Sequence, residues 1–530
     1  MRRGTGPLII TFGCAFVWMS AARAQFGRGD DWTTSGNDAQ RSSWVRTDAK
    51  ISKESMQKPG FQFLWKLKLD NRPRQLNSLT PPVLMDRYIG YRGFRSFGFV
   101  GGSSDRVFAI DTDLARMEWQ QQLPAGSPEP EGSVDCPGGL TTALTRLTST
   151  AMGTAPTGRT GGGRGGPARS GVGEPGLGAV TLAQAGAPRG SPSLPAAPSA
   201  PGAPGAAPGP RPRPAGFGGG FGQPAAVFAL SGDGMLHFMN VAHGVDIDPP
   251  VKFLPSNANA HGLIVVDDVA YVATTHGCAG VANGMWALDL ASRQVTTWKS
   301  TAGVSGSAGP AIGPDGTLYV ATREGVLVAL APKTLEPKDS YSAGKQEFTS
   351  SPVLFEHKGK ILLAAPTRDG RMHLLDTAAL GGADHQTPLY KTPVSSRAAD
   401  YRPGALASWL DPGGVRWVLA PTNGAIEAWK VADRNGSPVL EPGWVSRDIV
   451  SPLPAMIING VVFAVSSGQR APRSLPAVLY ALDGVSGKEL WNSGKTITSF
   501  ARGGLSGGGS QLYVGASDGT LYAFGFPMEH

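Results

Sequence analysis

Short apolar runs separated by glycine- and aspartate-containing turns recur along most of this chain. One example is the segment Asp315-Gly-Thr-Leu-Tyr-Val-Ala-Thr, which is followed directly by Gly325-Val-Leu-Val-Ala-Leu. Apolar runs of this length with glycine and aspartate between them are typical of strands joined in hairpins. Helical periodicity is hard to find anywhere in the chain. The pattern therefore predicts an all-β protein.

A related phrase occurs eight times, most fully as Leu479-Tyr-Ala-Leu-Asp483-Gly-Val-Ser-Gly-Lys-Glu-Leu-Trp491. The eight copies are centred on Ala109, Phe238, Ala287, Ala329, Leu374, Ala428, Ala481 and Ala523. Centres 238 and 287 lie 49 residues apart, and centres 481 and 523 lie 42 apart. Four-stranded propeller blades have a period of about 40 to 50 residues. The repeat predicts an eight-bladed β-propeller of four-stranded antiparallel blades.

The last copy, Gly519-Thr-Leu-Tyr-Ala-Phe-Gly, runs almost immediately into the C-terminus, so its blade lacks an outer strand. An unpaired sheet edge would remain open there. The segment Phe61 to Leu69 alternates apolar and polar residues, as a half-buried strand does, and it carries Trp65. We expect this N-terminal strand to pair with the last copy and close the ring.

Three copies place a tryptophan at a nearly constant distance after the aspartate of their turn. These residues are Trp119, Trp298 and Trp491, and Trp65 supplies the equivalent aromatic for the last blade. An aspartate-led turn followed by a strand with a large packing residue accounts for this spacing. We interpret all four tryptophans as structural.

The N-terminus has the features of a cleavable secretory signal over residues 1–24. Arg2 and Arg3 precede an apolar stretch from Pro7 to Met19, and Ala22-Arg-Ala24 stands before Gln25. The stretch is too short for a good membrane span, and Phe12 makes Cys14 a poor lipidation site. We expect a periplasmic or secreted protein with no transmembrane segment, in which residues 25–60 form an N-terminal extension and residues 61–530 form a single propeller.

Residues 151–223 are almost entirely Gly, Pro, Ala, Ser and Arg. Such a composition cannot bury enough apolar surface to offset its ordering entropy, which predicts a disordered insertion within the second blade. The signal and the insertion together hold the net charge of +8, so the ring itself is neutral. A neutral ring on an exported protein excludes nucleic acid as the expected partner. The basic insertion leaves an anionic polysaccharide open as a partner.

Two cysteines, Cys136 and Cys278, remain once the signal is removed. An even number of cysteines in an oxidising compartment is compatible with a disulfide, which would close a loop of more than a hundred residues. Two separate thiols are the alternative.

The repeats and the opening segment from Asp31 to Trp44 resemble the quinoprotein superfamily of pyrroloquinoline-quinone-type propellers. The resemblance extends over nearly the whole mature chain except the insertion, and it is strongest to the non-enzymatic, BamB-like members. For the enzymes of the family it implies a quinone above a central tryptophan, calcium held partly by an asparagine at a strand end, and a catalytic aspartate one blade later. A fold of this kind does not by itself define a function.

This chain departs from the enzyme pattern at the calcium-binding and catalytic positions. His276 stands where the resemblance implies the calcium-binding asparagine, and imidazole is a poor ligand for a hard cation. The segment from Trp298 to Pro310 contains no acid, so no obvious base remains for an alcohol proton. Neither adjacent cysteines nor a Cys-x-x-Cys-His motif occurs.

Two further groups of residues suggest chemistry only weakly. His261, His276 and Cys278 could hold a metal, but their spacing matches no metal motif, and a turn histidine with a structural cysteine is the simpler interpretation. Arg397 and Asp400 could serve a rearranged cofactor site, and a surface ion pair is the simpler interpretation. We predict no catalytic, cofactor or metal residues.

The leading hypothesis is an exported, monomeric, non-enzymatic propeller that acts as a scaffold in the cell envelope and binds an envelope protein or an anionic polysaccharide. The alternative is a divergent quinone-dependent dehydrogenase of alcohols or sugars, with pyrroloquinoline quinone and calcium as cofactors. A third possibility is a wall-associated protein in which the basic insertion binds the partner.

Overall fold

The computed structural model describes residues 31–90, 93–126, 132–152, 225–395, 397, 403–468 and 475–527. The chain divides into two units, residues 1–155 with 216–530 and residues 156–215, and every described residue belongs to the first. The proposed signal at residues 1–24 and nearly all of the insertion at residues 151–223 lie outside the described residues.

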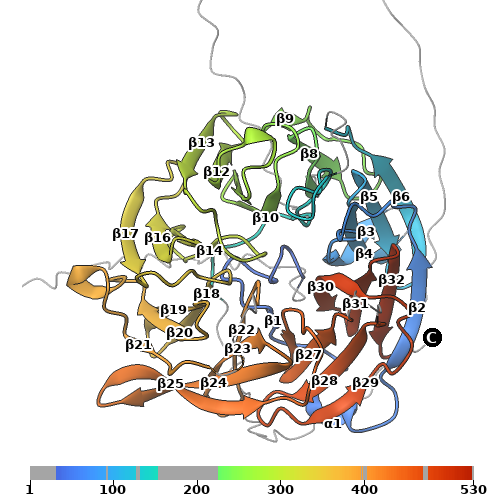
Figure 1. Ribbon diagram of the computed structural model, residues 1–530. Coiled ribbons are helices and arrows are strands. Elements are labelled where there is room, and N and C mark those ends of the chain that lie inside the picture. Colours follow the sequence, from blue (N-terminus) through green and yellow to red (C-terminus); the bar gives the residue numbers. More distant parts are fainter. Residues whose placement is uncertain are drawn as a thin grey trace, which may run out of the picture. The chain divides into compact units, whose positions relative to one another are not determined.

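Eight small sheets follow one another around a ring in sequence order, as the change from blue to red in Figure 1 shows. The strands of each blade are antiparallel to one another and follow in order from the axis outward. In blade 2 a separate segment takes the inner position, and in blade 7 a parallel N-terminal strand lies inside the first strand. Blade 1 is β3 (Val83–Gly90), β4 (Gly93–Gly102), β5 (Arg106–Asp111) and β6 (Arg116–Gln122). Blade 2 is β7 (Ala226–Leu230), β8 (Met235–Asn240) and β9 (Val251–Lys252).

Blades 3 to 5 repeat the four-stranded order. Blade 3 is β10 (Ala260–Val266), β11 (Val269–Thr274), β12 (Gly284–Asp289) and β13 (Val295–Lys299). Blade 4 is β14 (Ala311–Ile312), β15 (Leu318–Ala321), β16 (Val326–Leu330) and β17 (Pro337–Ser342). Blade 5 is β18 (Val353–His357), β19 (Lys360–Pro366), β20 (Met372–Asp376) and β21 (Tyr390–Lys391).

The last three blades include two strands from the N-terminal region. Blade 6 is β22 (Ala407–Leu410), β23 (Arg416–Thr422), β24 (Ala425–Arg434) and β25 (Ser437–Val445). Blade 7 is β26 (Met456–Ile458), β27 (Val461–Ser466), β28 (Val478–Asp483) and β29 (Glu489–Asn492), with β1 (Trp44–Val45) parallel to β26. Blade 8 is β30 (Ala501–Gly508), β31 (Gln511–Ala516), β32 (Thr520–Gly525) and β2 (Gln62–Lys68).

The described residues include one α-helix, α1 (Lys53–Met56), and two 3-10 helices, Cys278–Gly280 and Gly382–Asp384. The prediction of an all-β, eight-bladed propeller is therefore confirmed. Each of the eight repeat centres lies in the strand before the outermost one, from Ala109 in β5 to Ala523 in β32. The ring is closed as predicted, because β2 pairs with β32 in an antiparallel register that places Leu67 opposite Leu521.

Blade 2 departs from the four-stranded pattern. Its sheet has three strands, and its inner position is taken by Thr145, which forms an antiparallel bridge with Phe228. The insertion separates this inner segment from β7 in the sequence. A strand of regular length is therefore replaced by isolated bridges at this point of the ring.

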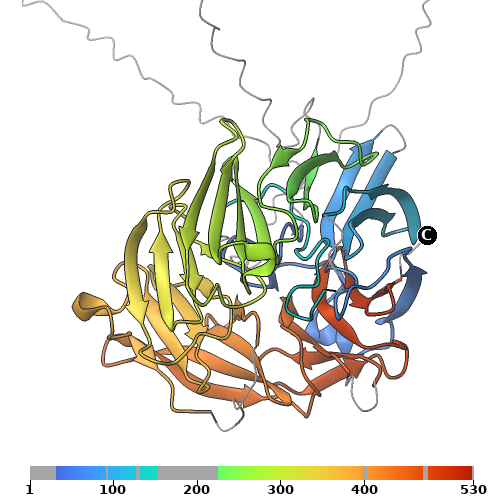
Figure 2. The same ribbon diagram turned by 45° about the horizontal axis from the view of Figure 1, so that its top comes forward.

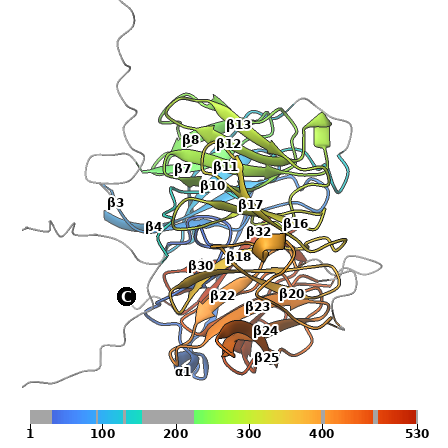
Figure 3. The same cartoon turned by 90° about the vertical axis from the view of Figure 1, so that its left-hand side faces the viewer.

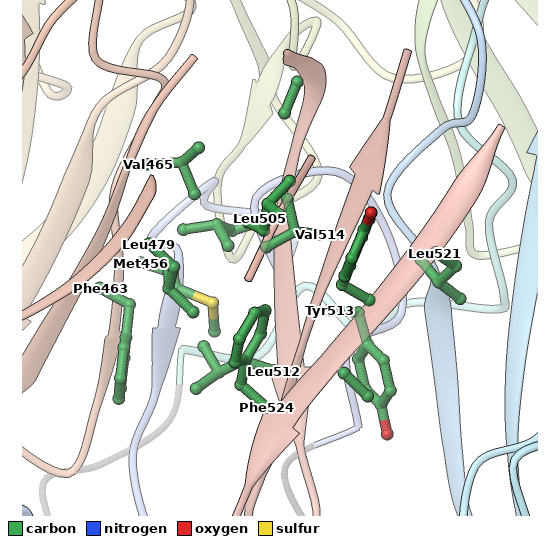
Figure 4. Close-up of a cluster of buried hydrophobic side chains, with 14 of the residues drawn as sticks. Met456, Phe463, Val465, Leu479, Leu505, Leu512, Tyr513, Val514, Leu521 and Phe524 are labelled. Carbon is green, nitrogen blue, oxygen red and sulfur yellow. The ribbon is translucent and has the colours of Figure 1, made fainter. Parts of the chain in front are cut away.

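The hydrophobic cores lie in the seams between neighbouring blades. Figure 4 shows one seam, where Phe463 and Leu479 of blade 7 face Leu512 and Phe524 of blade 8. Each blade packs one face of its sheet against the blade before it and the other face against the blade after it. Both faces must therefore be apolar, which explains continuous apolar strands such as β27 and β31. The packing holds the inner strands rigidly around the axis, where the candidate site lies.

Candidate functional site in the axial cavity

Residues 31–48 cross the inner segments of blades 1 to 7 and reach the turn between β30 and β31 of blade 8. Their backbone carbonyls accept hydrogen bonds from inner-strand N–H groups in the order of the blades: Trp32 from Leu84, Thr33 from Arg146, Ala39 from Ile312, Gln40 from Leu354, Ser42 from Ser408 and Ser43 from Ile457. Blade 3 is reached through Thr34, whose hydroxyl donates to the Leu263 carbonyl, and blade 8 through Asp48, which accepts from the Ser510 N–H. We call residues 31–48 the axial arm. It forms the floor of the central opening.

Arg41 anchors the axial arm beneath that opening. Its guanidinium donates to the carbonyl oxygens of Pro310 at 2.8 Å, Ser35 at 2.6 Å and Gly262 at 3.1 Å, and to the Thr34 hydroxyl at 3.0 Å. No carboxylate among the described residues forms a salt bridge with it. Burial lowers the pKa of Arg41 to about 9, and Asp38 opposes this shift, so the side chain is still positive near neutral pH.

A cavity of about 260 Å³ lies on the axis above the arm. Its floor includes Trp32, Ser35, Gly36 and Ser43 of the axial arm. Most of its wall consists of the first residues of inner strands and the loops before them: Leu76 to Pro81, Leu140 to Ala143, His261, Ser307 and Ala308, Ala405, Pro454 to Met456, and Arg502 to Leu505. Gly515 to Ser517, at the end of β31, complete it. Backbone, hydroxyl and apolar groups dominate this lining, and none of the described lining residues is an aspartate or a glutamate.

His261 is the one histidine in the cavity wall among the described residues. Its Nε2 is buried and has no hydrogen-bond partner in the described part of the protein. Burial lowers the pKa of His261 to about 4, and the positive charges of Arg323 and Arg41 lower it further. The imidazole is therefore neutral near pH 7.

Two glycines allow blades 3 and 4 to meet at this wall. A Cβ on Gly262 would lie 2.3 Å from the Gly309 Cα, and both residues have a positive φ, 70° and 77°. Only glycine adopts this backbone conformation without strain and also permits so close an approach. The pair fixes His261 beside the axial arm.

The loops at the mouth of the cavity carry the two cysteines. The structure joins Cys136, in the loop before the inner segment of blade 2, to Cys278, in the loop between β11 and β12, with their Cα atoms 5.5 Å apart. His276 lies beside this link, with its Nε2 2.9 Å from Arg323 Nη1 and 3.6 Å from Asp135 Oδ1. The bridge therefore holds together loops of two neighbouring blades next to a charged cluster.

The structure separates the residues that the sequence suggested for a metal. Cys278 is engaged with Cys136, His276 faces Arg323, and His261 is in the cavity wall. No group of three or more potential ligands occurs among the described residues. Arg397 lies in the loop before β22, where its carbonyl accepts from the Asn423 N–H, and Asp400 is outside the described residues.

The four tryptophans predicted to be structural lie in the outer strands, where they contact apolar and backbone groups. Trp119 is buried, and its Nε1 donates to the Val241 carbonyl at 2.9 Å. Trp491 forms an edge contact with Phe61 at 4.9 Å between ring centres. Trp65 and Trp298 are partly buried against the cores of blades 8 and 3. All four lie away from the described cavity lining.

The described residues do not fit the quinone and calcium site that the resemblance implies. Calcium needs several oxygen ligands, usually including carboxylates, and the described cavity lining supplies none of these acids. The position implied for a calcium ligand is His276, whose Nε2 lies 2.9 Å from the positively charged guanidinium of Arg323. Repulsion between that guanidinium and a divalent cation would oppose binding there.

Arg41 and the floor formed by the axial arm were not anticipated from the sequence. The segment around Arg41 is polar and lacks a strand period, so no local pattern places it at the centre of the ring. The resemblance of residues 31–44 to the quinoprotein family was the only signal that drew attention to this segment, and it gave no role to Arg41.

No family model and no curated protein matches the chain. Among solved structures, the quinohemoprotein alcohol dehydrogenase from Comamonas testosteroni has a TM-score of 0.54 and 14% identity, covering 96% of this chain and 82% of the other. A europium-containing methanol dehydrogenase has a TM-score of 0.52 and 12% identity, covering 94% and 98%. BamB from Moraxella catarrhalis has a TM-score of 0.48 and 13% identity, covering 89% and 99%. At such identities the likeness concerns the fold alone, and the chain shares its propeller fold with the quinoprotein dehydrogenases.

Proposed function

We propose that this protein is an exported, non-enzymatic propeller of the cell envelope that binds a protein or polymer partner in its axial cavity and on the surrounding loops. The observation that carries this proposal is the composition of the cavity. Its described lining offers backbone, hydroxyl and apolar contacts, with one histidine and one arginine, and it includes no carboxylate. These groups are suited to binding rather than to proton abstraction.

The state of His261 supports the same conclusion. A general base works best when its pKa lies near the working pH. The pKa of His261 is about 4, so its neutral ring has little drive to take the proton of an alcohol near pH 7. The described lining offers no acid that could replace it.

The size and charge of the cavity suggest what enters it. Pockets for whole drug-sized ligands measure roughly 300 to 1,000 Å³. At about 260 Å³ this cavity suits one protruding group of a larger partner, such as a side chain or a single sugar ring. The buried positive charge of Arg41 behind the wall, without a carboxylate salt bridge, favours an electron-rich or acidic group.

The envelope location remains a proposal from the sequence. It rests on the basic start, the apolar stretch and the small residues before Gln25. Among the residues that the structure describes, no helix is long and apolar enough to span a membrane.

The enzymatic alternative is tested directly with the chain from Gln25 onward. The purified protein is mixed with pyrroloquinoline quinone and calcium, while tryptophan fluorescence and dye-linked oxidation of alcohols and sugars are recorded. We expect no turnover. Saturable quenching accompanied by turnover would overturn the non-enzymatic proposal.

The role of the cavity is tested by filling it. Ala405 lies in the wall, and Ala405→Trp would occupy much of the space, whereas Val394→Trp adds the same ring at a position that is 56% exposed. Partners crosslinked from envelope extracts are compared for the wild type and both variants, and the affinity of each identified partner is then measured. We expect Ala405→Trp alone to lose the partner. Equal binding by both variants would exclude the cavity as the site.

A further inference from the structure

Arg416 is a buried arginine whose side chain donates no hydrogen bond to any other described residue. It begins β23, opposite Leu410 at the end of β22, and only 7% of it is exposed. Its Nε is buried without a hydrogen-bond partner, and no described carboxylate forms a salt bridge with it. A guanidinium carries five N–H donors, and burying such a charged group unpaired is costly. An acceptor for these donors is therefore expected.

The contacts of Arg416 differ from those of the other buried arginine on the axis. Four oxygen acceptors surround the guanidinium of Arg41. The Cζ of Arg416 instead lies 5.6 Å from the ring centre of Trp44 and 5.9 Å from that of Phe355. Aromatic rings attract a cation through their faces, but they do not replace the oxygen acceptors that a guanidinium binds in its own plane. The rings therefore position Arg416 and leave its N–H groups unused.

A second arginine lies over the same tryptophan. The Cζ of Arg46 is 4.8 Å from the ring centre of Trp44, and its Nη2 is 3.7 Å from Asp38 Oδ2. Asp38 already accepts hydrogen bonds from Ser42, from the N–H at 2.9 Å and from the hydroxyl at 2.5 Å. One carboxylate with other partners therefore stands against two positive charges, and an excess of positive charge remains beside Trp44.

The other carboxylate whose charge reaches Arg416 is Glu356 on β18. Burial lowers the pKa of Arg416 to about 10, and the charge of Glu356 opposes this shift. Glu356 is exposed, and its Oε1 accepts a hydrogen bond from the Gly359 N–H at 2.6 Å. Arg416 is thus positive near neutral pH, and no described carboxylate neutralises it by direct contact.

This group of residues lies between blade 5, blade 6 and the axial arm. Strands β18 and β22 are neighbours (Figure 3), and blades 5 and 6, coloured from yellow to orange, follow one another in the tilted view of Figure 2. The axial cavity lies mainly at the starts of the inner strands, whereas Arg416 pairs with the last residue of β22. The side chain of Arg46 is 21% exposed, so a small group from solvent can reach this end of the sheets.

We propose that Arg416 and Arg46 bind a small oxyanion, a phosphate or a carboxylate, beside Trp44. Guanidinium groups bind such ions through forked, charge-assisted hydrogen bonds. The anion would accept from N–H donors that have no acceptor among the described residues, and it would offset the excess positive charge. A neutral hydroxyl group would accept a hydrogen bond without offsetting any charge. This inference does not depend on the axial cavity or on the partner proposed for it.

The test measures the binding of inorganic phosphate and of acetate by isothermal titration calorimetry. The chain from Gln25 onward is used at pH 7, at an ionic strength held constant with sodium chloride. Arg416→Met keeps an apolar side chain against the two rings and removes the donors, and Arg46→Met removes the second charge. Arg293→Met, at an exposed position in the turn between β12 and β13, is the matched control.

We expect the wild type to have one saturable site, and the ion with the higher affinity identifies phosphate or carboxylate as the preferred group. Affinity should fall about tenfold or more in Arg416→Met and in Arg46→Met and stay unchanged in Arg293→Met. Undiminished binding by Arg416→Met would overturn the proposal, because the anion would then bind elsewhere. Arg46→Met decides the question in the same way if Arg416→Met does not fold. Absence of binding of both ions to the wild type would also overturn it.

Denaturant unfolding provides a second measurement, which a purely structural role of Arg416 would not affect. Without phosphate or carboxylate, Arg416→Met should be at least as stable as the wild type, because it removes an unpaired buried charge. With the preferred anion at saturation, the wild type should become the more stable of the two, because the anion binds only its folded state. A wild type that gains no more stability from phosphate or acetate than from chloride would contradict the proposal.

Discussion

The indole Nε1 of Trp65 donates a hydrogen bond to the carbonyl oxygen of Thr112 at 3.2 Å. Trp65 lies on β2, the strand that completes blade 8, and Thr112 follows β5 of blade 1. Two other outer-strand tryptophans make the same contact with the next blade, Trp119 with Val241 and Trp444 with Gly484, each at 2.9 Å. The closing strand therefore reproduces at the junction of the two chain ends the contact found between consecutive blades.

Removing this contact should weaken the closed ring. We expect Trp65→Ala to lower the free energy of unfolding by about 2 to 3 kcal/mol, since a partly buried ring and a hydrogen bond are lost, and Trp65→Phe to lower it by about 1 kcal/mol. Denaturant unfolding followed by circular dichroism measures both. Lys66→Ala, at the exposed neighbouring position, should leave the free energy of unfolding unchanged. If Trp65→Ala also left it unchanged, the role of this strand in closing the ring would be contradicted.

Arg41 is predicted to hold the axial arm in place. Arg41→Met leaves the carbonyl oxygens of Ser35, Gly262 and Pro310 without their shared donor, so we expect a loss of about 3 to 5 kcal/mol in unfolding free energy. Arg41→Lys should restore little, because an ammonium cannot reach the same fork of acceptors. Limited proteolysis should show faster cleavage within residues 31–48 in both variants, and resistance equal to the wild type would contradict this role.

Two glycine-to-alanine variants can distinguish the steric effect of the close approach between Gly262 and Gly309 from the effect of backbone strain alone. Gly262 and Gly277 have similar φ values, 70° and 61°, but a Cβ meets backbone at 2.3 Å on Gly262 and nothing within 4 Å on Gly277. We expect Gly277→Ala to cost about 1 kcal/mol and Gly262→Ala at least about 2 kcal/mol more, measured by denaturant unfolding. Equal costs would mean that blades 3 and 4 do not meet as closely as described.

The buried state of His261 predicts a loss of stability in mild acid. Its pKa is about 4 in the folded protein against 6.5 as the ordinary value, so the unfolded chain binds more protons between these limits. The contribution is fully present above pH 6.5 and is lost as the pH falls toward 4, by at most about 1.4 kcal/mol per pH unit. We expect His261→Asn to reduce this slope and exposed His243→Asn to leave it unchanged. If the free energies of unfolding of the wild type and His261→Asn fell by the same amount between pH 6.5 and pH 4.5, this role of His261 would be contradicted.

The structure joins Cys136 to Cys278, and this bond is predicted to form when the protein is kept under oxidising conditions. Because the cysteines are 142 residues apart, a chain-entropy model gives a contribution of about 4 to 5 kcal/mol. The double variant Cys136→Ser with Cys278→Ser should unfold at a markedly lower temperature than the wild type. For the chain from Gln25 onward, which lacks Cys14, intact mass after alkylation should show two modified thiols only after reduction. Modification of this chain without reduction would exclude the bond.

Much of the fold could be predicted from the sequence because the blades are local structures. Each copy of the repeat holds its own turns and apolar runs within about 40 to 50 residues, so the blade type and number are encoded without long-range information. The closing strand was also predictable, because an unpaired edge in the last copy and an alternating segment near the N-terminus match each other. The constant spacing from aspartate to tryptophan also predicts that Trp119 and Trp491 lie in the final strands of their blades, because it is set by a single local turn.

The candidate site depends on tertiary structure. The axial arm pairs with strands up to several hundred residues away, and its polar sequence has no period that reveals such partners. Arg41 meets Gly262 and Pro310 only because blades 3 and 4 converge on the axis. His261, His276 and Cys278 are close in sequence but have different surroundings. His261 lines the cavity, His276 contacts Arg323, and Cys278 is bonded to Cys136. Local periodicity determined the repeating sheets, whereas closure of the ring decided which polar residues meet at its centre, since only closure brings all eight inner strands together.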